Sequence, residues 1–206
     1  GEARVNTWAG AEQQYSSVAG LTGGNYIITW ADSSGYDGGS GWDVRGQILN
    51  QDGQPLGDAF LVNTYTSSSQ YQPSVASLTD GGFVVAWRDD SGHSGGSSSD
   101  IRVQQFDGGG NIVGSEQLVN SGYTTGAQHQ PSVTGLVNGG YAVVWEDDQG
   151  QSSGSSSDVW AQVYGANGGV AVSGFRLNQT TSDHQEKPNV TALKDGGFAA
   201  TWESYN

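Results

Sequence analysis

The chain repeats itself at intervals of 57 or 58 residues. Each copy carries an apolar run that ends in tryptophan, and the four tryptophans are Trp30, Trp87, Trp145 and Trp202. The valines that open each copy keep the same spacing and are Val18, Val75, Val133 and Val190. A unit of this length buries its apolar surface only by stacking on its neighbours. The repeat therefore predicts an array of similar units around a shared core.

Each unit reads as a series of short strands. Paired glycines such as Gly81 and Gly82 separate two apolar runs, and glycine accepts the positive φ of a hairpin turn. A polar loop follows, and then a third strand, expected at 43–49, 100–106 and 158–164. A fourth strand closes the unit, and no segment sustains a helical period. Four antiparallel strands per unit predict an all-β fold, a β-propeller-like array of four-stranded antiparallel repeats.

The repeat boundaries give a single domain over residues 1–206. The units span approximately 5–61, 62–118 and 119–176, with a partial unit at 177–206. The chain opens on a strand of the fourth type, at 3–6, and stops after the second strand of the last unit. We therefore expect about four blades, the last one incomplete or completed by the N-terminal strand. Strands supplied by a neighbouring molecule are the alternative.

The charge balance limits the partners. Lys and Arg number 7 and Asp and Glu number 21, which gives a formal net charge of −14. Such a chain is repelled by nucleic acid and by anionic lipid, and it lacks an apolar run long enough to insert in a membrane. Cysteine is absent, so disulfides and thiol chemistry are excluded. Dense carboxylates favour hydration in salty surroundings or divalent cations as partners.

Acidic residues open and close the polar loop after each of the first three repeated tryptophans. Glycine and serine fill the loops, and Ca²⁺ is bound by six to eight oxygens from carboxylates, carbonyls and water. The loops therefore predict calcium ligands at Asp32, Asp37, Asp43, Asp89, Asp90, Asp100, Asp147, Asp148 and Asp158. The alternative is that these residues form solvated turns in which Asp caps a strand or an Asx-turn.

One copy of the unit, Gln70–Gln104, resembles a known family. Its pattern Gln-x-x-Pro-Ser-Val, Asp-Gly-Gly-Phe-Val-Val-x-Trp and Asp-Ile-x-x-Gln is similar to tandem repeats of secreted bacterial RTX, or hemolysin-type calcium-binding, proteins, including RTX adhesins. Residues 38–43 also fit the Gly-Gly-x-Gly-x-Asp pattern of RTX nonapeptides. The resemblance implies export from the cell, calcium in the medium and a role at the cell surface or in a matrix.

Aromatic residues beside the polar loops suggest a second kind of site. Trp42, Trp160 and Tyr36 are the main candidates, with Tyr71 and Tyr123 as further ones. Sugar rings stack on exposed aromatic faces while Asp, Asn and Gln take the hydroxyls. The alternative is structural packing, because Trp42 and Trp160 have no counterpart in the second unit.

The sequence contains no clear catalytic motif. His93, His129 and His184 lack metal-ligand spacing, and the acid pairs recur from unit to unit. We therefore expect a protein that is not an enzyme, an extracellular structural or adhesion module with Ca²⁺ in its loops. The alternatives are a lectin-like carbohydrate-binding propeller and a fibre subunit that assembles by strand completion. The expected partners are glycans or surface and matrix proteins, with a homo-oligomer or fibre as an option.

Overall fold

The computed structural model describes residues 4–6, 10–35, 39–93, 99–148, 157–180 and 184–205. The regular structure in these ranges consists of β-strands and one 3₁₀ turn, Thr22–Gly24. No helix in them is long and apolar enough to cross a membrane. The absence of α-helix among the described residues agrees with the strand-only pattern of the sequence.

Three antiparallel sheets have four strands each, in chain order, and a fourth sheet has two. The first sheet contains β1 (Gln13–Gly20), β2 (Tyr26–Asp32), β3 (Asp43–Leu49) and β4 (Phe60–Leu61). The second contains β5 (Gln70–Ser77), β6 (Phe83–Asp89), β7 (Asp100–Phe106) and β8 (Ile112–Leu118). The third contains β9 (Gln128–Gly135), β10 (Tyr141–Asp147), β11 (Asp158–Tyr164) and β12 (Val170–Arg176). The last contains β13 (Gln185–Ala192) and β14 (Phe198–Ser204).

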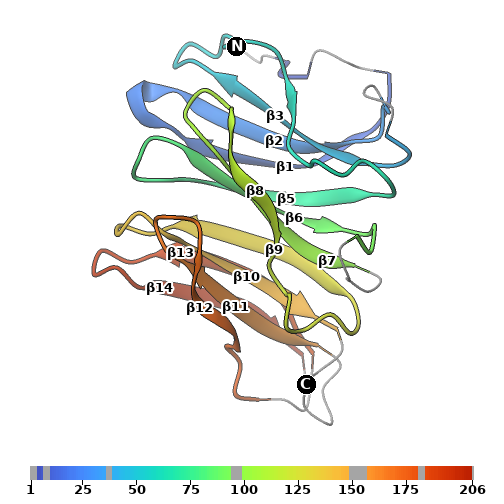
Figure 1. Ribbon diagram of the computed structural model, residues 1–206, viewed down its shortest axis with the longest axis vertical. Helices are drawn as coiled ribbons and strands as arrows, with labels where there is room; N and C mark the ends of the chain where they lie inside the picture. Colours follow the sequence, from blue (N-terminus) through green and yellow to red (C-terminus); the bar gives the residue numbers. More distant parts are fainter. Residues whose placement is uncertain are drawn as a thin grey trace.

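The sheets stack face to face in chain order, and their first strands β1, β5, β9 and β13 lie side by side (Figure 1). The all-β, propeller-type array of four-stranded repeats predicted from the sequence is confirmed. The last blade is incomplete in the described chain. Residues 4–6 form no strand, and Asn6 donates to Gln13 Oε1 at 3.1 Å in the first sheet. This segment lies at the opposite end of the stack from β13 and β14 (Figure 1).

Apolar side chains from neighbouring sheets fill the space between them. Trp87 is fully buried and packs with Ile27 and Val44 of the first sheet. Trp145 occupies the same position one junction later, among Ile101 and Val103 of the second sheet. Because each strand alternates its side chains between two faces, every inner sheet contributes to two cores. The stacking of neighbouring sheets therefore buries the apolar side chains of each repeat.

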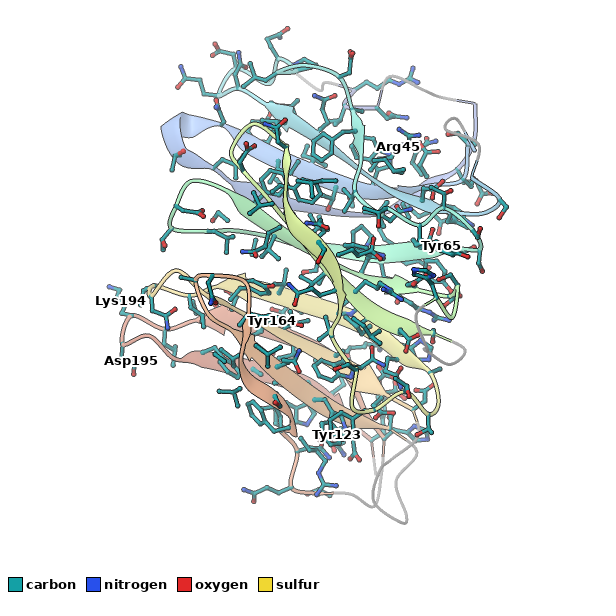
Figure 2. The ribbon with its side chains drawn as sticks, viewed as in Figure 1. Arg45, Tyr65, Tyr123, Tyr164, Lys194 and Asp195 are labelled. Carbon is teal, nitrogen blue, oxygen red and sulfur yellow. The ribbon has the colours of Figure 1, made fainter. Side chains whose placement is uncertain are left out.

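The hairpin turns form as the glycine pairs predict. Gly81, Gly139 and Gly196 have φ values of +93°, +90° and +98°, a region that side chains other than glycine rarely adopt. The last of these turns joins β13 to β14 and carries Lys194 and Asp195 at its tip (Figure 2). The tip lies at the end of the sheet opposite to the start of β13.

A buried chain of polar side chains joins each sheet to the next. At the first junction, Asn63 Nδ2 donates to Asp43 Oδ1 at 2.9 Å and to Gln70 Oε1 at 3.3 Å. Gln70 Nε2 in turn donates to Asp89 Oδ1 at 3.0 Å in the second sheet. All four side chains are at most 2% exposed. Since a buried polar group must find partners, this chain fixes the register between the sheets.

The later junctions repeat the arrangement. Asn120 Nδ2 donates to Asp100 Oδ1 and to Gln128 Oε1, both at 2.8 Å. Asn178 Nδ2 donates to Asp158 Oδ1 at 2.6 Å. Gln70 and Gln128, which occupy matched positions at the start of β5 and β9, thus form side-chain hydrogen bonds at the junctions between sheets.

Replacement of Asn120 by alanine is expected to lower stability strongly. The change leaves the buried Asp100 carboxylate and Gln128 amide without a shared donor, which costs about 3 kcal/mol. For a chain of this size the melting temperature should fall by about 6–12 °C in a thermal melt. Asn111→Ala is the control, because its hydrogen bonds lie within one exposed turn, and it should shift the melting temperature by less than about 2 °C. Equal shifts for the two variants would contradict the role of the buried chain.

Candidate functional site

Most of the predicted calcium ligands belong to the buried polar chain. Asp32, Asp43, Asp89, Asp100, Asp147 and Asp158 are each at most 2% exposed. They lie opposite one another across neighbouring strands, in the pairs Asp32–Asp43, Asp89–Asp100 and Asp147–Asp158. Arginine neutralises part of this charge, since Arg102 Nε contacts Asp89 Oδ2 at 2.8 Å. These carboxylates link the ends of neighbouring strands and link one sheet to the next.

No group of three or more His, Asp or Glu side chains within the described ranges is arranged to hold a metal ion. Asp37 and Tyr36 lie outside the described residues. Calcium binding in the loops stays a prediction. Asp90 and Asp148, the two remaining candidates, differ from the others because they lie beyond the ends of β6 and β10, where their side chains are 22% and 43% exposed.

The two candidate tryptophans have different environments. Trp160 is 7% exposed and belongs to the core between the second and third sheets, with its ring 4.2 Å from that of Tyr123. Trp42 is half-buried at the surface, and its backbone is fixed to the next sheet because Gln70 N donates to Trp42 O at 2.7 Å. Of the two rings, that of Trp42 is placed to meet a ligand.

Trp42 lines a pocket of about 310 Å³, here called the aromatic pocket, with Gln14, Tyr15, Ser69, Tyr71 and Asp90. The rings of Tyr15 and Tyr71 stack at 6.2 Å between centroids. Tyr71 donates its hydroxyl proton to Asp90 Oδ2 at 2.6 Å, and burial followed by this hydrogen bond raises its pKa to about 12. The pocket thus combines three aromatic rings with amide, hydroxyl and carboxylate groups.

A central pocket of about 380 Å³ adjoins it where the first strands of the four sheets converge. Its walls are Tyr15–Ser17, Gln72–Ser74, Gln130–Ser132, Pro188 and Asn189. At this level each first strand bulges, and one non-glycine residue per strand takes a left-handed backbone. These residues are Tyr15, Gln72, Gln130 and Lys187, with φ between +48° and +55°. Such strain is common where a fold presents side chains for function.

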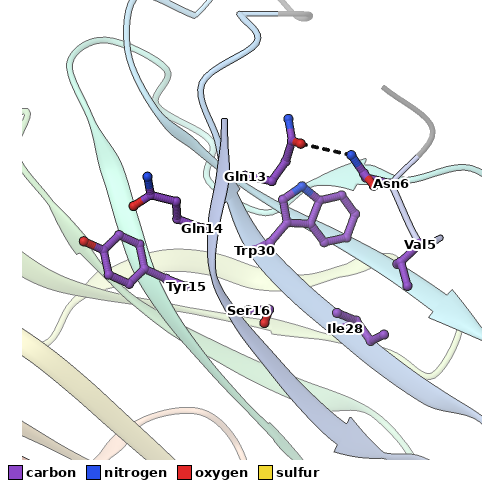
Figure 3. Close-up of a pocket in the computed structure, with 8 residues that line it drawn as sticks. All are labelled: Val5, Asn6, Gln13, Gln14, Tyr15, Ser16, Ile28 and Trp30. Atoms are coloured by element: carbon purple, nitrogen blue, oxygen red, sulfur yellow. Dashed lines mark hydrogen bonds between the residues drawn. The ribbon is translucent and has the colours of Figure 1, made fainter. Parts of the chain in front are cut away.

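A third pocket, of about 460 Å³, lies on the first sheet beside the Trp30 ring and the Asn6–Gln13 hydrogen bond (Figure 3). It includes Gln14, Tyr15 and Ser16, so all three pockets share Tyr15. Tyr15 is 51% exposed. We name the three pockets together the axial groove, and Tyr15 is the residue common to all of them.

The rim of the groove is the place where the repeats differ. The second residue of each first strand is Gln14, Tyr71, His129 or Glu186, and the residue facing it on the second strand is Ala31, Arg88, Glu146 or Glu203. The adjoining buried positions keep the same residue types in nearly every unit. The rim therefore presents a different set of side chains in each unit, on a repeated backbone.

Ion pairs connect the rim across the second junction. Arg88 Nε donates to Asp90 Oδ1 at 2.8 Å, and its Nη1 lies 2.6 Å from His129 Nδ1. His129 Nε2 lies 2.7 Å from Asp148 Oδ2. Because a guanidinium only donates, Nδ1 of His129 accepts, and the ring proton is on Nε2 and faces Asp148.

Glu146 is the rim carboxyl with the most altered titration. It is 6% exposed, and Lys187 N donates to its Oε2 at 3.2 Å. Burial raises its pKa to about 7, and the negative charges of Asp148 and Glu186 act in the same direction. A carboxyl that keeps its proton near neutral pH can donate it to a ligand. The sequence analysis missed Glu146 and Tyr15; comparison of matched positions between units would have marked both.

Comparison with solved structures supports the β-propeller-type fold. No protein-family model matches the chain, and no curated protein sequence matches it. An α-L-arabinanase from Penicillium chrysogenum is similar in structure, with a TM-score of 0.61 and 18% identity over 99% of this chain and 56% of that one. The Hadza microbial sialidase Hz136 has a TM-score of 0.61 and 9% identity over 86% and 39%. A Dyadobacter fermentans protein of unknown function gives 0.61 and 13% over 98% and 64%. The chain thus spans less than two thirds of each of these proteins.

These likenesses correct three sequence-based expectations. The resemblance to RTX repeats is wrong, because the similar structures are β-propeller glycosidases and no family model supports RTX repeats. The structural or adhesion role followed from that resemblance and is withdrawn with it. The expectation that the chain is not an enzyme is overturned as well, since the fold neighbours include an arabinanase and a sialidase. The absence of a repeated active-site motif misled the sequence analysis, because the rim residues vary from unit to unit.

Glu146→Gln is expected to stabilise the protein at alkaline pH. The raised pKa means that ionising Glu146 costs folding free energy, so the wild type keeps its full relative stability below about pH 4.5 and loses it as pH rises through about 7. Above pH 8 the variant should melt about 5 °C higher than the wild type. Melting curves from pH 4 to 9 measure the difference, and a gap that is constant with pH would contradict the assignment.

Proposed function

We propose that this chain is a carbohydrate-active β-propeller that binds glycan along the axial groove. The observation that carries the proposal is the aromatic pocket, where Trp42, Tyr15 and Tyr71 surround Gln14, Ser69 and Asp90. Aromatic faces stack on the C–H faces of sugars, and amide, hydroxyl and carboxylate groups pair with sugar hydroxyls. The carbohydrate names of the fold neighbours support the same class of ligand.

The axial groove suits an extended ligand. The central pocket continues the groove with the amides of Gln72, Gln130 and Asn189 and the hydroxyls of Ser74 and Ser132. An oligosaccharide could place one ring on the aromatic pocket and direct the next ring to these polar groups. A polymeric glycan substrate agrees with the predicted extracellular location, which stays a prediction.

A second candidate function, glycoside hydrolysis, rests on Glu146. A glycosidase needs one carboxylic acid that is protonated near neutral pH and a second carboxylate that is ionised. Glu146 has the raised pKa of the acid, and Asp148, which influences that pKa, is 43% exposed. Glu146 would protonate the leaving oxygen. The side chain of Asp148 is hydrogen-bonded to that of Glu146, which is closer than the about 5–9.5 Å that separates the two carboxyls of a glycosidase, so Asp148 does not supply the second carboxylate. Glu146 lies at the rim beside the central pocket and does not line it, so recognition is the function that the geometry supports best.

Trp42→Ala is expected to weaken glycan binding at least about tenfold, because a stacking surface in the aromatic pocket is lost. Arabinan oligosaccharides are a suitable first probe, and isothermal titration calorimetry measures their dissociation constant. Ile112→Ala is the matched control, since Ile112 is 52% exposed on the outer strand β8 and lies outside the groove. Unchanged affinity for Trp42→Ala, with a folded protein in the thermal melt, would refute the aromatic pocket as the binding site.

Glu146→Gln tests hydrolysis separately from binding. If Glu146 is the acid, the release of reducing sugar should fall at least about 100-fold while the dissociation constant changes less than about threefold. The activity of the wild type should also decline above pH 7 as Glu146 ionises. Hydrolysis that survives in the variant would exclude Glu146 as the acid, and wild-type protein that binds without hydrolysis would leave recognition as the function.

A further inference from the structure

The charges around the axial groove bear on which glycans it accepts. The fold neighbours differ in this respect, because an arabinanase acts on an uncharged polymer and a sialidase on an acidic sugar. None of the residues that line the three pockets is Lys or Arg, and Asp90 is the one charged residue among them. A ligand carboxylate would thus meet no lining cation and one lining anion.

The rim is also acidic. Arg88 and Lys187 are the cations that lie along it, and each already has a carboxylate partner, Asp90 at 2.8 Å and Glu203 at 2.8 Å. The rim carries more carboxyl groups than cations. The five carboxyl groups are Asp90, Glu146, Asp148, Glu186 and Glu203. His129 lies between Arg88 and the carboxylate of Asp148, with its Nε2 at 2.7 Å from Asp148 Oδ2.

The rest of the cations are placed elsewhere. The chain has seven Lys and Arg residues in all. Arg45, Arg102 and Arg176 contact the carboxylates of Asp32, Asp89 and Asp158, which are buried at the strand ends. Lys194 lies in the β13–β14 turn at the opposite end of the sheet (Figure 2), and Arg4 contacts Asn6 without lining a pocket. Arg4 thus lies beside the third pocket through Asn6, whereas Arg88 and Lys187, the described cations beside the aromatic and central pockets, are each paired with a carboxylate.

We infer that the axial groove selects uncharged glycans and rejects glycans that carry carboxylates, such as uronic and sialic acids. The inference rests on the proposed carbohydrate function and adds the charge class of the ligand. Its physical basis is that burying a ligand carboxylate beside Asp90 costs desolvation, while the nearest cation, Arg88, is already paired with Asp90. The rim carboxylates add a longer-range repulsion that salt screens.

Pairs of glycans that share a backbone and differ in charge test the inference. Polygalacturonate and its fully methyl-esterified form make one pair, glucuronoxylan and its carboxyl-reduced form make another, and arabinan provides a neutral reference. Dissociation constants are measured at low salt and in 0.5 M NaCl. We expect the neutral member of any pair that binds to bind at least about tenfold more tightly at low salt, and the gap to shrink in salt.

Asp90→Asn provides the matching variant. It removes the lining charge and frees Arg88, so the affinity for the acidic member relative to the neutral member should rise at least about fivefold. Asp195→Asn makes the same charge change in the distant β13–β14 turn and should leave the ratio unchanged. An acidic glycan that binds wild-type protein as tightly as its neutral partner overturns the inference. Failure of arabinan and of every member of both pairs to bind would instead count against the proposed function.

Discussion

The buried chain of Asp, Asn and Gln side chains is the interaction on which the rest of the structure depends. Apolar packing alone would let neighbouring sheets slide, because Val, Ile and Ala side chains fit one another in many registers. Asn63 removes that freedom by bonding to Asp43 in its own sheet and Gln70 in the next. A slip of one residue would leave buried carboxylates without donors, at a cost of several kcal/mol. The strand ends therefore meet at one level.

That shared level is what creates the groove. Each first strand bulges two residues after its first glutamine, as at Tyr15, which follows Gln13, and Gln72, which follows Gln70. Because the glutamines are held at matching heights, the bulged residues converge from neighbouring sheets and bound a single pocket. The scaffold thus repeats the backbone geometry, and the side chains at the bulge and beside it are free to differ.

The sequence predicted the features that each unit must share. The spacing of Trp30, Trp87 and Trp145 set the number of units, and the third strand of the second unit begins and ends as predicted, at Asp100 and Phe106. Interactions between sheets were harder to anticipate. A loop that starts and ends with Asp reads equally well as a metal ligand set or as strand-end pairing, because both need carboxylates at the same spacing. The partner that separates the two, Asn120 for Asp100, lies 20 residues away.

The sequence analysis missed the functional residues because it searched for recurring motifs. Such a search discards the positions that vary from unit to unit. Glu146 matches Ala31 in the first unit and Arg88 in the second, and an acid recurs only at Glu203 of the partial last unit, so the position looked like surface variation. Its environment is nevertheless supplied by the repeat, because β10 buries it and the bulge of β13 directs Lys187 N to its carboxylate. Burial raises the pKa of Glu146 there, although the hydrogen bond from Lys187 N acts in the opposite direction, whereas Arg88 at the matched site forms ion pairs. One repeated geometry can therefore support different chemistry in each unit, and the function of the groove depends on which side chain each unit contributes.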